Sequence, residues 1–419
     1  MPVKPPRLQR TLALALVSLT LAAMVAAEGP GTALVAPPPS VATIPGMPPV
    51  VNPENLYSEI AADKMSPAIA GDPRRVYVPN LQSNDVYVID QDTLTVIDKF
   101  RVGLNPQHVV PSWDMRTLWV ANNAENTNVG SLTPIDPRTG KAGKAIPVDD
   151  PYNMYFSPDG KSAIIVAEAF KRLDFRDPKT MAMQSSLDVP RCGGINHADF
   201  SIDGRFAIFT CEFTGTIAKI DLVNRKVLGY IQLIKPGLPT QVVKGIDGRD
   251  EVICTTWKGM PQDIRVSPDG KTFFVADMMS DGVHVVDGDS FRQTGFIPTG
   301  IGAHGLYPSR DGKKLYVANR GSNKIHGLPR GKGGVSVIDF ATKKVEVTWP
   351  IPGGGSPDMG NVSADGRTLW LSGRYDNVVY AIDTGTGDVK KVPVGREPHG
   401  LSVWPQPGRY SLGHTGNMR

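Results

Sequence analysis

A turn motif of the form Ser-Pro-Asp-Gly recurs along this chain, and it constrains the fold more than any other feature. Its clearest copies, close variants included, lie at residues 157–160, 201–204, 267–270 and 363–366. Looser copies around Asp72, Asp114 and Asp311 bring the number to seven. Most of these aspartates follow one another at a spacing of about 40 to 50 residues, which is typical of propellers and solenoids. Only the intervals from Asp203 to Asp269 and from Asp311 to Asp365 are longer.

An alternating strand that ends in aspartate provides a second, independent marker of the repeat. It occurs at residues 86–90, 217–221, 335–339 and 379–383, with weaker copies that end at Asp136, Asp177 and Asp287. An apolar strand lies between the two markers and another follows the second, so each unit holds four short strands, named A to D from the inside outward. Seven antiparallel units of this kind predict an all-β, seven-bladed β-propeller. The 44 glycines and 37 prolines suit a fold with this many turns.

Segments 315–319 and 335–339, together with the Ser-Pro-Asp-Gly-Lys turns, resemble the YVTN-type (YncE-like) seven-bladed β-propeller family of exported bacterial proteins. The resemblance covers almost everything after residue 54. Related propellers include the haem d1 domain of nitrite reductase and the lactonase-type propellers. The resemblance therefore implies a fold but does not select one activity.

The pattern of strand A also bears on how the ring closes. Strand A occurs eight times, because residues 398–404 begin a repeat that the chain does not finish. Either this segment completes the first blade, or residues 65–70 fill that place and the C-terminus packs elsewhere. We favour closure by the C-terminal strand, which makes residues 54–419 a single propeller domain.

Residues 1–27 have the pattern of a secretory signal peptide. Lys4, Arg7 and Arg10 precede an uncharged apolar run at residues 12–25, which is short for a membrane span. Residues 28–53 are rich in proline, alanine, glycine and valine, and we expect them to form a linker. The pattern predicts a secreted or periplasmic protein with no membrane span after signal cleavage. An uncleaved N-terminal anchor is the alternative.

The charge of the chain argues against a nucleic-acid partner. It has 45 Lys and Arg against 41 Asp and Glu, and three of the cations lie in the signal region, so the rest of the chain is nearly neutral. Binding to phosphates requires a clustered excess of cations. We instead expect a monomer whose partner is a small molecule, a metal ion or a protein.

A ligand site is predicted at the mouth of the central channel. The long intervals place insertions at about residues 235–258 and 325–334, both in loops of the face where strand A begins. Every blade also has a polar residue near the start of strand A: His108, Asn153, His197, Asp263, His304, Asp358 and His399. At the ends of strand B, Glu168, Glu212 and Asp277 add carboxylates. These side chains converge on the channel, where they could bind a polar ligand.

Two further interpretations remain open. The imidazoles of His197, His304 and His399 are candidate ligands of a zinc or copper ion, which would make the protein a metal carrier in the cell envelope. The resemblance to lactonase-type propellers implies His108, His197, Glu212 and Arg320 as candidates for hydrolysis. No diagnostic catalytic motif supports an enzyme, and no Cys-x-x-Cys-His is present, which excludes c-type haem. The outer rim could also serve as a protein-docking platform.

The three cysteines, Cys192, Cys211 and Cys254, allow one disulfide in an oxidising compartment. The hairpin turn near Asp203 places Cys211 almost opposite Ile195, so Cys192 and Cys211 are the best-placed pair. Cys254, in the longer insertion, could instead pair with either of them.

Overall fold

The computed structural model describes residues 40–245, 248, 250–325 and 331–411. The chain divides into two units, residues 1–38 and 39–419, and the described residues belong to the second. The predicted signal peptide therefore lies outside the described residues. Within the described part, the helices are two short 3-10 turns, η1 (Leu56–Ile60) and η2 (Pro67–Ile69), and no helix is long and apolar enough to cross a membrane.

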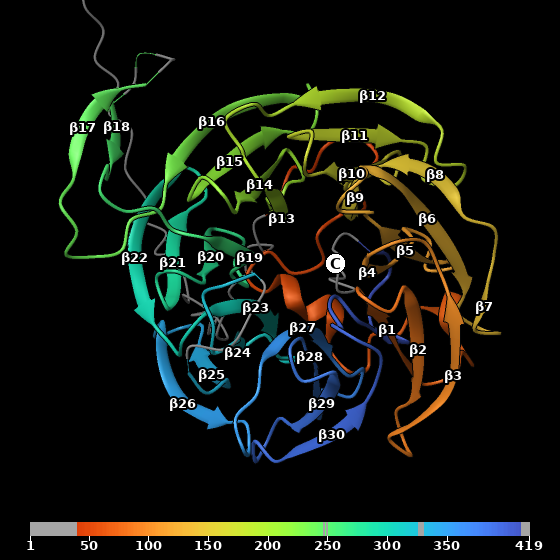
Figure 1. The fold of residues 1–419 in the computed structure, drawn as a ribbon. Coiled ribbons are helices and arrows are strands. Elements are labelled where there is room, and N and C mark those ends of the chain that lie inside the picture. Colours follow the sequence, from red (N-terminus) through yellow and green to blue (C-terminus); the bar gives the residue numbers. More distant parts are fainter. Residues whose placement is uncertain (1–39, 246–247, 249, 326–330, 412–419) are drawn as a thin grey trace, which may run out of the picture. The chain divides into compact units, whose positions relative to one another are not determined.

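Seven sheets, built from antiparallel neighbours, form the blades of a β-propeller in the described residues, as the repeat predicts (Figure 1). Blade 1 consists of β1 (Arg75–Asn80), β2 (Asp85–Asp90), β3 (Thr95–Arg101) and β31 (Ser402–Trp404). Blade 2 consists of β4 (Pro106–Pro111), β5 (Leu118–Asn122), β6 (Val129–Asp136), β7 (Lys141–Ala142) and β8 (Ile146–Asp149). Blade 3 consists of β9 (Pro151–Phe156), β10 (Ala163–Ala167), β11 (Arg172–Arg176) and β12 (Met183–Asp188).

The other four blades repeat this order. Blade 4 consists of β13 (Ile195–Phe200), β14 (Phe206–Cys211), β15 (Thr216–Asp221) and β16 (Lys226–Gln232). Blade 5 consists of β19 (Pro261–Val266), β20 (Thr272–Asp277), β21 (Gly282–Asp287) and β22 (Arg292–Pro298). Blade 6 consists of β23 (Ala303–Pro308), β24 (Lys314–Asn319), β25 (Gly334–Asp339) and β26 (Lys344–Pro350). Blade 7 consists of β27 (Pro357–Val362), β28 (Thr368–Gly373), β29 (Val378–Asp383) and β30 (Val389–Pro393).

The Ser-Pro-Asp-Gly motif forms the turn between strands A and B. In the copy between β9 and β10, the Ser157 hydroxyl donates to an Asp159 carboxylate oxygen at 2.6 Å, and the same oxygen accepts from the Lys161 N–H at 3.1 Å. Gly160 has φ +68°, a left-handed conformation that glycine adopts without a steric cost. Each residue of the motif thus has a distinct role in the turn, which explains why the motif marks the repeat.

Burial falls from the inside of each blade to the outside. In β10, a strand B, every residue is buried, because neighbouring blades pack on both of its faces. In β3, a strand D, six of seven residues are exposed. The hydrophobic core therefore consists of layers between blades.

The C-terminal strand closes the ring, as predicted. Strand β31 pairs antiparallel with β1, with Val76 opposite Val403, and becomes the innermost strand of blade 1. Residues 65–70 do not take that place, although Met65 forms isolated bridges with Pro407 and Gly408. The first blade is therefore assembled from both ends of the described chain.

Segments before and after the propeller cross the face that carries the A–B turns. Ile44 donates its N–H to the Asp203 carbonyl at 3.0 Å, and the Tyr57 hydroxyl donates to the Val266 carbonyl at 2.6 Å. On the C-terminal side, the Tyr410 ring stacks on Trp113 with the ring centroids 4.4 Å apart. Residues from about 40 onward thus contact the blades, although the segment up to residue 53 was expected to be a linker.

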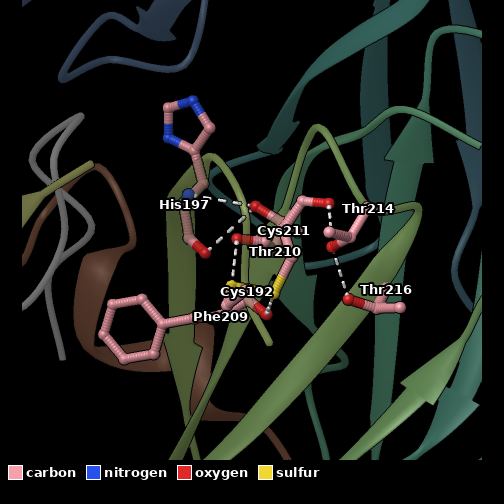
Figure 2. The surroundings of a disulfide bond; sticks show 7 residues. All are labelled: Cys192, His197, Phe209, Thr210, Cys211, Thr214 and Thr216. Atoms are coloured by element: carbon pink, nitrogen blue, oxygen red, sulfur yellow. Dashed lines mark hydrogen bonds between the residues drawn. A yellow bond between two sulfur atoms is a disulfide. The ribbon is translucent and has the colours of Figure 1, made fainter. Parts of the chain in front are cut away.

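The structure contains a disulfide between Cys192 and Cys211 (Figure 2). Cys211 ends β14, and Cys192 lies in the loop that leads into β13 of the same blade. Cys254 is a buried free thiol beyond the hairpin formed by β17 (Gln241–Lys244) and β18 (Asp250–Ile253). This hairpin, which forms much of the longer insertion, projects from the periphery of the ring (Figure 1).

Candidate functional site

The residues at the start of strand A form two tiers. The upper tier consists of the first polar position at the start of strand A, or, for His399, just before β31: Gln107, Tyr152, Asn196, Gln262, His304, Asp358 and His399. The lower tier is one residue further along: His108, Asn153, His197, Asp263, Gly305, Met359 and Gly400. Five upper-tier residues line a cavity at the channel mouth, whereas no lower-tier residue does. Side chains at the start of strand A thus reach the cavity only from the upper tier.

Four of the predicted site residues, His108, Asn153, His197 and Asp263, belong to the lower tier. The His108 ring lies against Gly400, where an added Cβ would come within 1.8 Å of Nδ1. The ring centroid of His108 is also 5.3 Å from that of His197 and 4.8 Å from that of His399. The imidazoles of His108 and His197 are fully buried and lie beneath the cavity, whereas that of His399 lines it.

The residue that follows strand B contributes the second set of cavity side chains. In blades 2, 3, 4, 6 and 7 this position holds Asn123, Glu168, Glu212, Arg320 and Arg374, and all five line the cavity. Arg374 was missed in the sequence, although reading this one position in every blade would have found it.

Asp277 was predicted to belong to the same set as Glu168 and Glu212. It is the last residue of β20, however, and so lies one residue before the position that follows strand B. Its carboxylate accepts from the Met260 N–H at 3.0 Å and approaches His284 on strand C at 3.3 Å. Asn122 and Asn319, at the equivalent positions, also bond side chains of strand C. Asp277 thus links strands within its blade and does not line the cavity.

The cavity has a volume of about 220 Å³ and receives side chains from all seven blades. Its walls differ in charge. Glu125, Asp150, Glu168 and Glu212 come from blades 2 to 4, and Arg320 and Arg374 come from blades 6 and 7. His304, His399, Tyr152, Gln107 and Gln262 complete much of the lining.

Asp358 organises the cationic wall from a fully buried position. One carboxylate oxygen, Oδ1, accepts from Nη2 and Nε of Arg320, at 2.7 and 3.3 Å. The other, Oδ2, makes no hydrogen bond to a described residue, and it lies 3.7 Å from His399 Nε2 and 3.9 Å from Arg374 Nη1. Burial alone would raise the pKa of this carboxyl, but Arg320, His304 and His399 hold it well below its usual value.

The surroundings of His304 determine its protonation. A guanidinium can only donate hydrogen bonds, so His304 Nε2 accepts from Arg320 Nη2. The proton of a neutral ring is then on Nδ1, which lies 2.8 Å from Asp358 Oδ1. Burial, followed by the nearby Arg320 charge, lowers the pKa of His304 to about 4. Burial also lowers the pKa of His108 to about 3 and those of His197 and His399 well below the usual value. All four imidazoles are neutral at pH 7.

The carboxyls of the opposite wall shift in the other direction. Burial, and then the proximity of Glu212, raises the pKa of Glu168 well above its usual value, and burial also raises that of Glu212. Burial likewise raises the pKa of Asp150 to about 6. Glu212 accepts a hydrogen bond from Asn196 Nδ2 at 3.0 Å. Burial therefore favours the protonated form of each of these carboxyls more than water does.

The candidate metal ligands fit an ion poorly. His304, Asp358 and His399 offer ligand atoms within 4.8 Å of one another, whereas His197 is not in this group. Zinc, however, requires ligands at about 2.0–2.3 Å and replaces the protons of its ligands. Here the Arg320 guanidinium already bonds both His304 and Asp358. The positive charge that a metal would supply at this point is supplied by arginine.

Comparisons with known proteins agree with the fold. A family model for the YNCE-like beta-propeller matches residues 245–407, which supports the predicted resemblance. Antigen Lp49 of Leptospira interrogans (serovar copenhageni, strain Fiocruz L1-130) is 28% identical over 179 residues. The match covers 37% of this chain and 36% of the antigen, so the chain matches about a third of that protein's length.

Two solved structures illustrate the similarity of fold. The dihydro-heme d1 dehydrogenase NirN, in complex with DHE, superposes with a TM-score of 0.55 at 15% identity, over 80% of this chain and 78% of that one. A protein from Bacteroides fragilis NCTC 9343, described as a putative 6-phosphogluconolactonase, has a TM-score of 0.57 at 15% identity. The superposition covers 80% of this chain and 99% of that one. At these identities the similarity concerns the propeller fold alone.

Proposed function

We propose that this propeller is a binding protein for a small polar solute, which it holds in the cavity at the channel mouth. The observation that carries the proposal is the pair of arginines in the cavity wall. Arg320 is 2% exposed and Arg374 is 3% exposed, and both line the cavity. Each guanidinium is paired with a buried carboxylate, Arg320 with Asp358 and Arg374 with Glu397. Each has five N–H donors, more than this pairing uses, which leaves donors for a solute in the cavity.

The cavity size limits the class of solute. Pockets for drug-sized ligands typically measure about 300–1,000 Å³, and this cavity of about 220 Å³ is smaller. A solute of a few heavy atoms with several hydrogen-bonding groups suits such a space. The hydrolytic alternative has less support, because His108 and His197 lie beneath the cavity while only Glu212 and Arg320 line it.

Calorimetric titration with a panel of small carboxylates, amines, amino acids and polyols tests this proposal. We expect saturable binding of at least one compound, weakened at least tenfold by Arg374→Gln. Tyr152→Phe removes only a phenolic oxygen from the cavity wall and provides a second, milder variant. Arg396→Gln, an exposed arginine before strand A of blade 1, is the matched control. Absence of binding across the panel, or equal binding by all variants, would overturn the proposal.

Residues 1–27 also lead us to propose that the chain is exported, and expression with its native N-terminus tests this. We expect the recovered protein to begin near Glu28 in N-terminal sequencing. A protein that retains Met1 would contradict cleavage.

A further inference from the structure

We infer that the bound solute is a zwitterion, a small molecule with a cationic amine and an anionic carboxylate, which spans the cavity between its two charged walls. This inference rests on the proposed function and specifies its ligand. The separation of charge by blade is its first support. Carboxyls come only from blades 2 to 4 and guanidiniums only from blades 6 and 7 among the described lining residues.

Unpaired acceptors mark where the amine would lie. Gln107 donates its amide N–H to Glu125 at 2.8 Å, and Asn123 donates its own to Asp150 at 3.0 Å. These bonds fix how both amides are oriented, because a carboxylate only accepts. The amide oxygens of Gln107 and Asn123 are buried and have no hydrogen-bond partner among the described residues.

Buried acceptors without a partner are uncommon in folded proteins and call for an explanation. An ammonium group carries three donors and no acceptor, so it could satisfy several such oxygens at once. A carboxylate placed at the same wall would instead meet acceptors of its own kind. This wall is therefore complementary to a cation.

The opposite wall suits a carboxylate. Arg374 donates from Nε to Glu397 at 3.1 Å, and Arg320 is held by Asp358 as described above. The two anions position the guanidiniums rigidly, and each guanidinium has five N–H donors, more than these contacts use. Arginine matches the planar geometry of a carboxylate with paired hydrogen bonds.

The raised pKa values of Glu168 and Glu212 provide a further signature. The groups that face this pair are Asp150, Glu125 and Tyr152 on one side and Arg320 and Arg374 on the other. A bound amine would favour the ionised form of the pair, so protons should be released on binding. A ligand that is only an anion should not cause this release.

Titration with matched probes tests the inference. The zwitterions are glycine, 4-aminobutanoate and 5-aminopentanoate; the single-charge probes are acetate, butanoate and pentanoate, with methylamine, propylamine and butylamine. We expect at least one zwitterion to bind at least tenfold more tightly than both its matched acid and its matched amine. Acids or amines that bind as tightly as the zwitterions would overturn the inference but leave the proposed function intact. Failure of every probe and of the polyols would overturn both.

One variant and its control test where the amine lies. Glu168→Gln has nearly the shape of the protonated acid, so the fold should be kept, and zwitterion binding should weaken at least tenfold while acid binding does not. Titrations in two buffers of different ionisation enthalpy should show proton release in the wild type and its loss in this variant. Asp149→Asn, which is exposed beside the same wall, is the control. Unchanged affinity and proton release in Glu168→Gln would place the amine elsewhere and overturn the assignment.

Discussion

Arg320 directs two of its N–H groups to a single carboxylate oxygen of Asp358, while the other oxygen of Asp358 has no hydrogen bond to a described residue. The pair is almost completely buried, with exposed fractions of 2% and 0% for the two side chains. The ion pair is thus a structural element of the channel as well as part of the cavity wall.

Asp358→Asn should therefore destabilise the fold. The substitution leaves the buried Arg320 charge uncompensated, and breaking a buried pair in this way costs about 3–5 kcal/mol. Urea unfolding measures the change. The control is Asp92→Asn, which removes the partner of Arg74 in an exposed pair and should cost less than about 1 kcal/mol. Equal losses in both variants would contradict the importance of this burial.

The neutral state of His304 predicts a dependence of stability on acid. Its pKa is about 4 in the folded protein, against about 6.5 in an unfolded chain, so the unfolded state binds more protons between these values. Stability from this residue is present above about pH 6.5 and is lost as the pH falls toward 4, by on the order of 3 kcal/mol.

Comparison with His304→Gln isolates this contribution, because other groups titrate in the same range. Between pH 6 and 5 the free energy of unfolding of the wild type should fall more steeply than that of the variant. The difference in slope should correspond to about one additional proton taken up on unfolding. Nitrogen NMR at pH 7 should show the neutral ring protonated on Nδ1. Parallel pH profiles for the two proteins would refute the expectation.

Removal of the disulfide should lower stability by a moderate amount. Cys192 and Cys211 are 19 residues apart, and a cross-link that closes a loop of about this size typically contributes about 3 kcal/mol. The variant Cys192→Ala/Cys211→Ala should unfold at correspondingly lower urea concentration and lose its sensitivity to reductant. Alkylation of the denatured, unreduced wild type should modify one thiol, Cys254. Modification of three thiols would show that the disulfide is absent.

The closing strand predicts a strong effect from a residue near the end of the chain. Trp404 is fully buried in β31 and donates its indole N–H to Asp72 at 3.0 Å. Trp404→Ala should cost about 3–5 kcal/mol, and amide exchange should increase in β1, the partner of β31. Val347→Ala, on an outer strand with Val347 44% exposed, should change stability by no more than about 0.5 kcal/mol. Unaltered exchange in β1 would argue against closure by β31.

The architecture was predictable because local chemistry repeats in each blade. The Ser157 and Asp159 side chains build their turn without help from distant residues, so the motif can be recognised in the sequence. Closure was predictable for a related reason, since residues 398–404 have the pattern of a strand A that lacks the rest of a blade. The hairpin of β17 and β18 was seen only as an excess of residues, because its position depends on tertiary contacts such as that of Glu251 with Arg191.

The residues that line the cavity were harder to predict from the sequence, because the backbone at the start of strand A is irregular. Strand A is irregular where it begins: the register with strand B shifts between Ile195 and Ala198 in blade 4 and between Pro261 and Ile264 in blade 5. Such bulges break the alternation of side chains along a strand. The sequence could therefore not show which of two adjacent residues lines the cavity. In blade 2, where the register also shifts, Gln107 lines it, whereas the neighbouring His108 was favoured on chemical grounds.

Pairing of β1 with β31 has a consequence for the newly made chain. Strand β1 is synthesised early, yet its inner partner is among the last described residues. During most of translation, Val76 and Tyr77 thus belong to an apolar strand with one open edge, which is a template for pairing with other chains. Blades 2 to 7 all lie between the two strands in the sequence, so this edge of β1 stays unpaired until all of them have been synthesised.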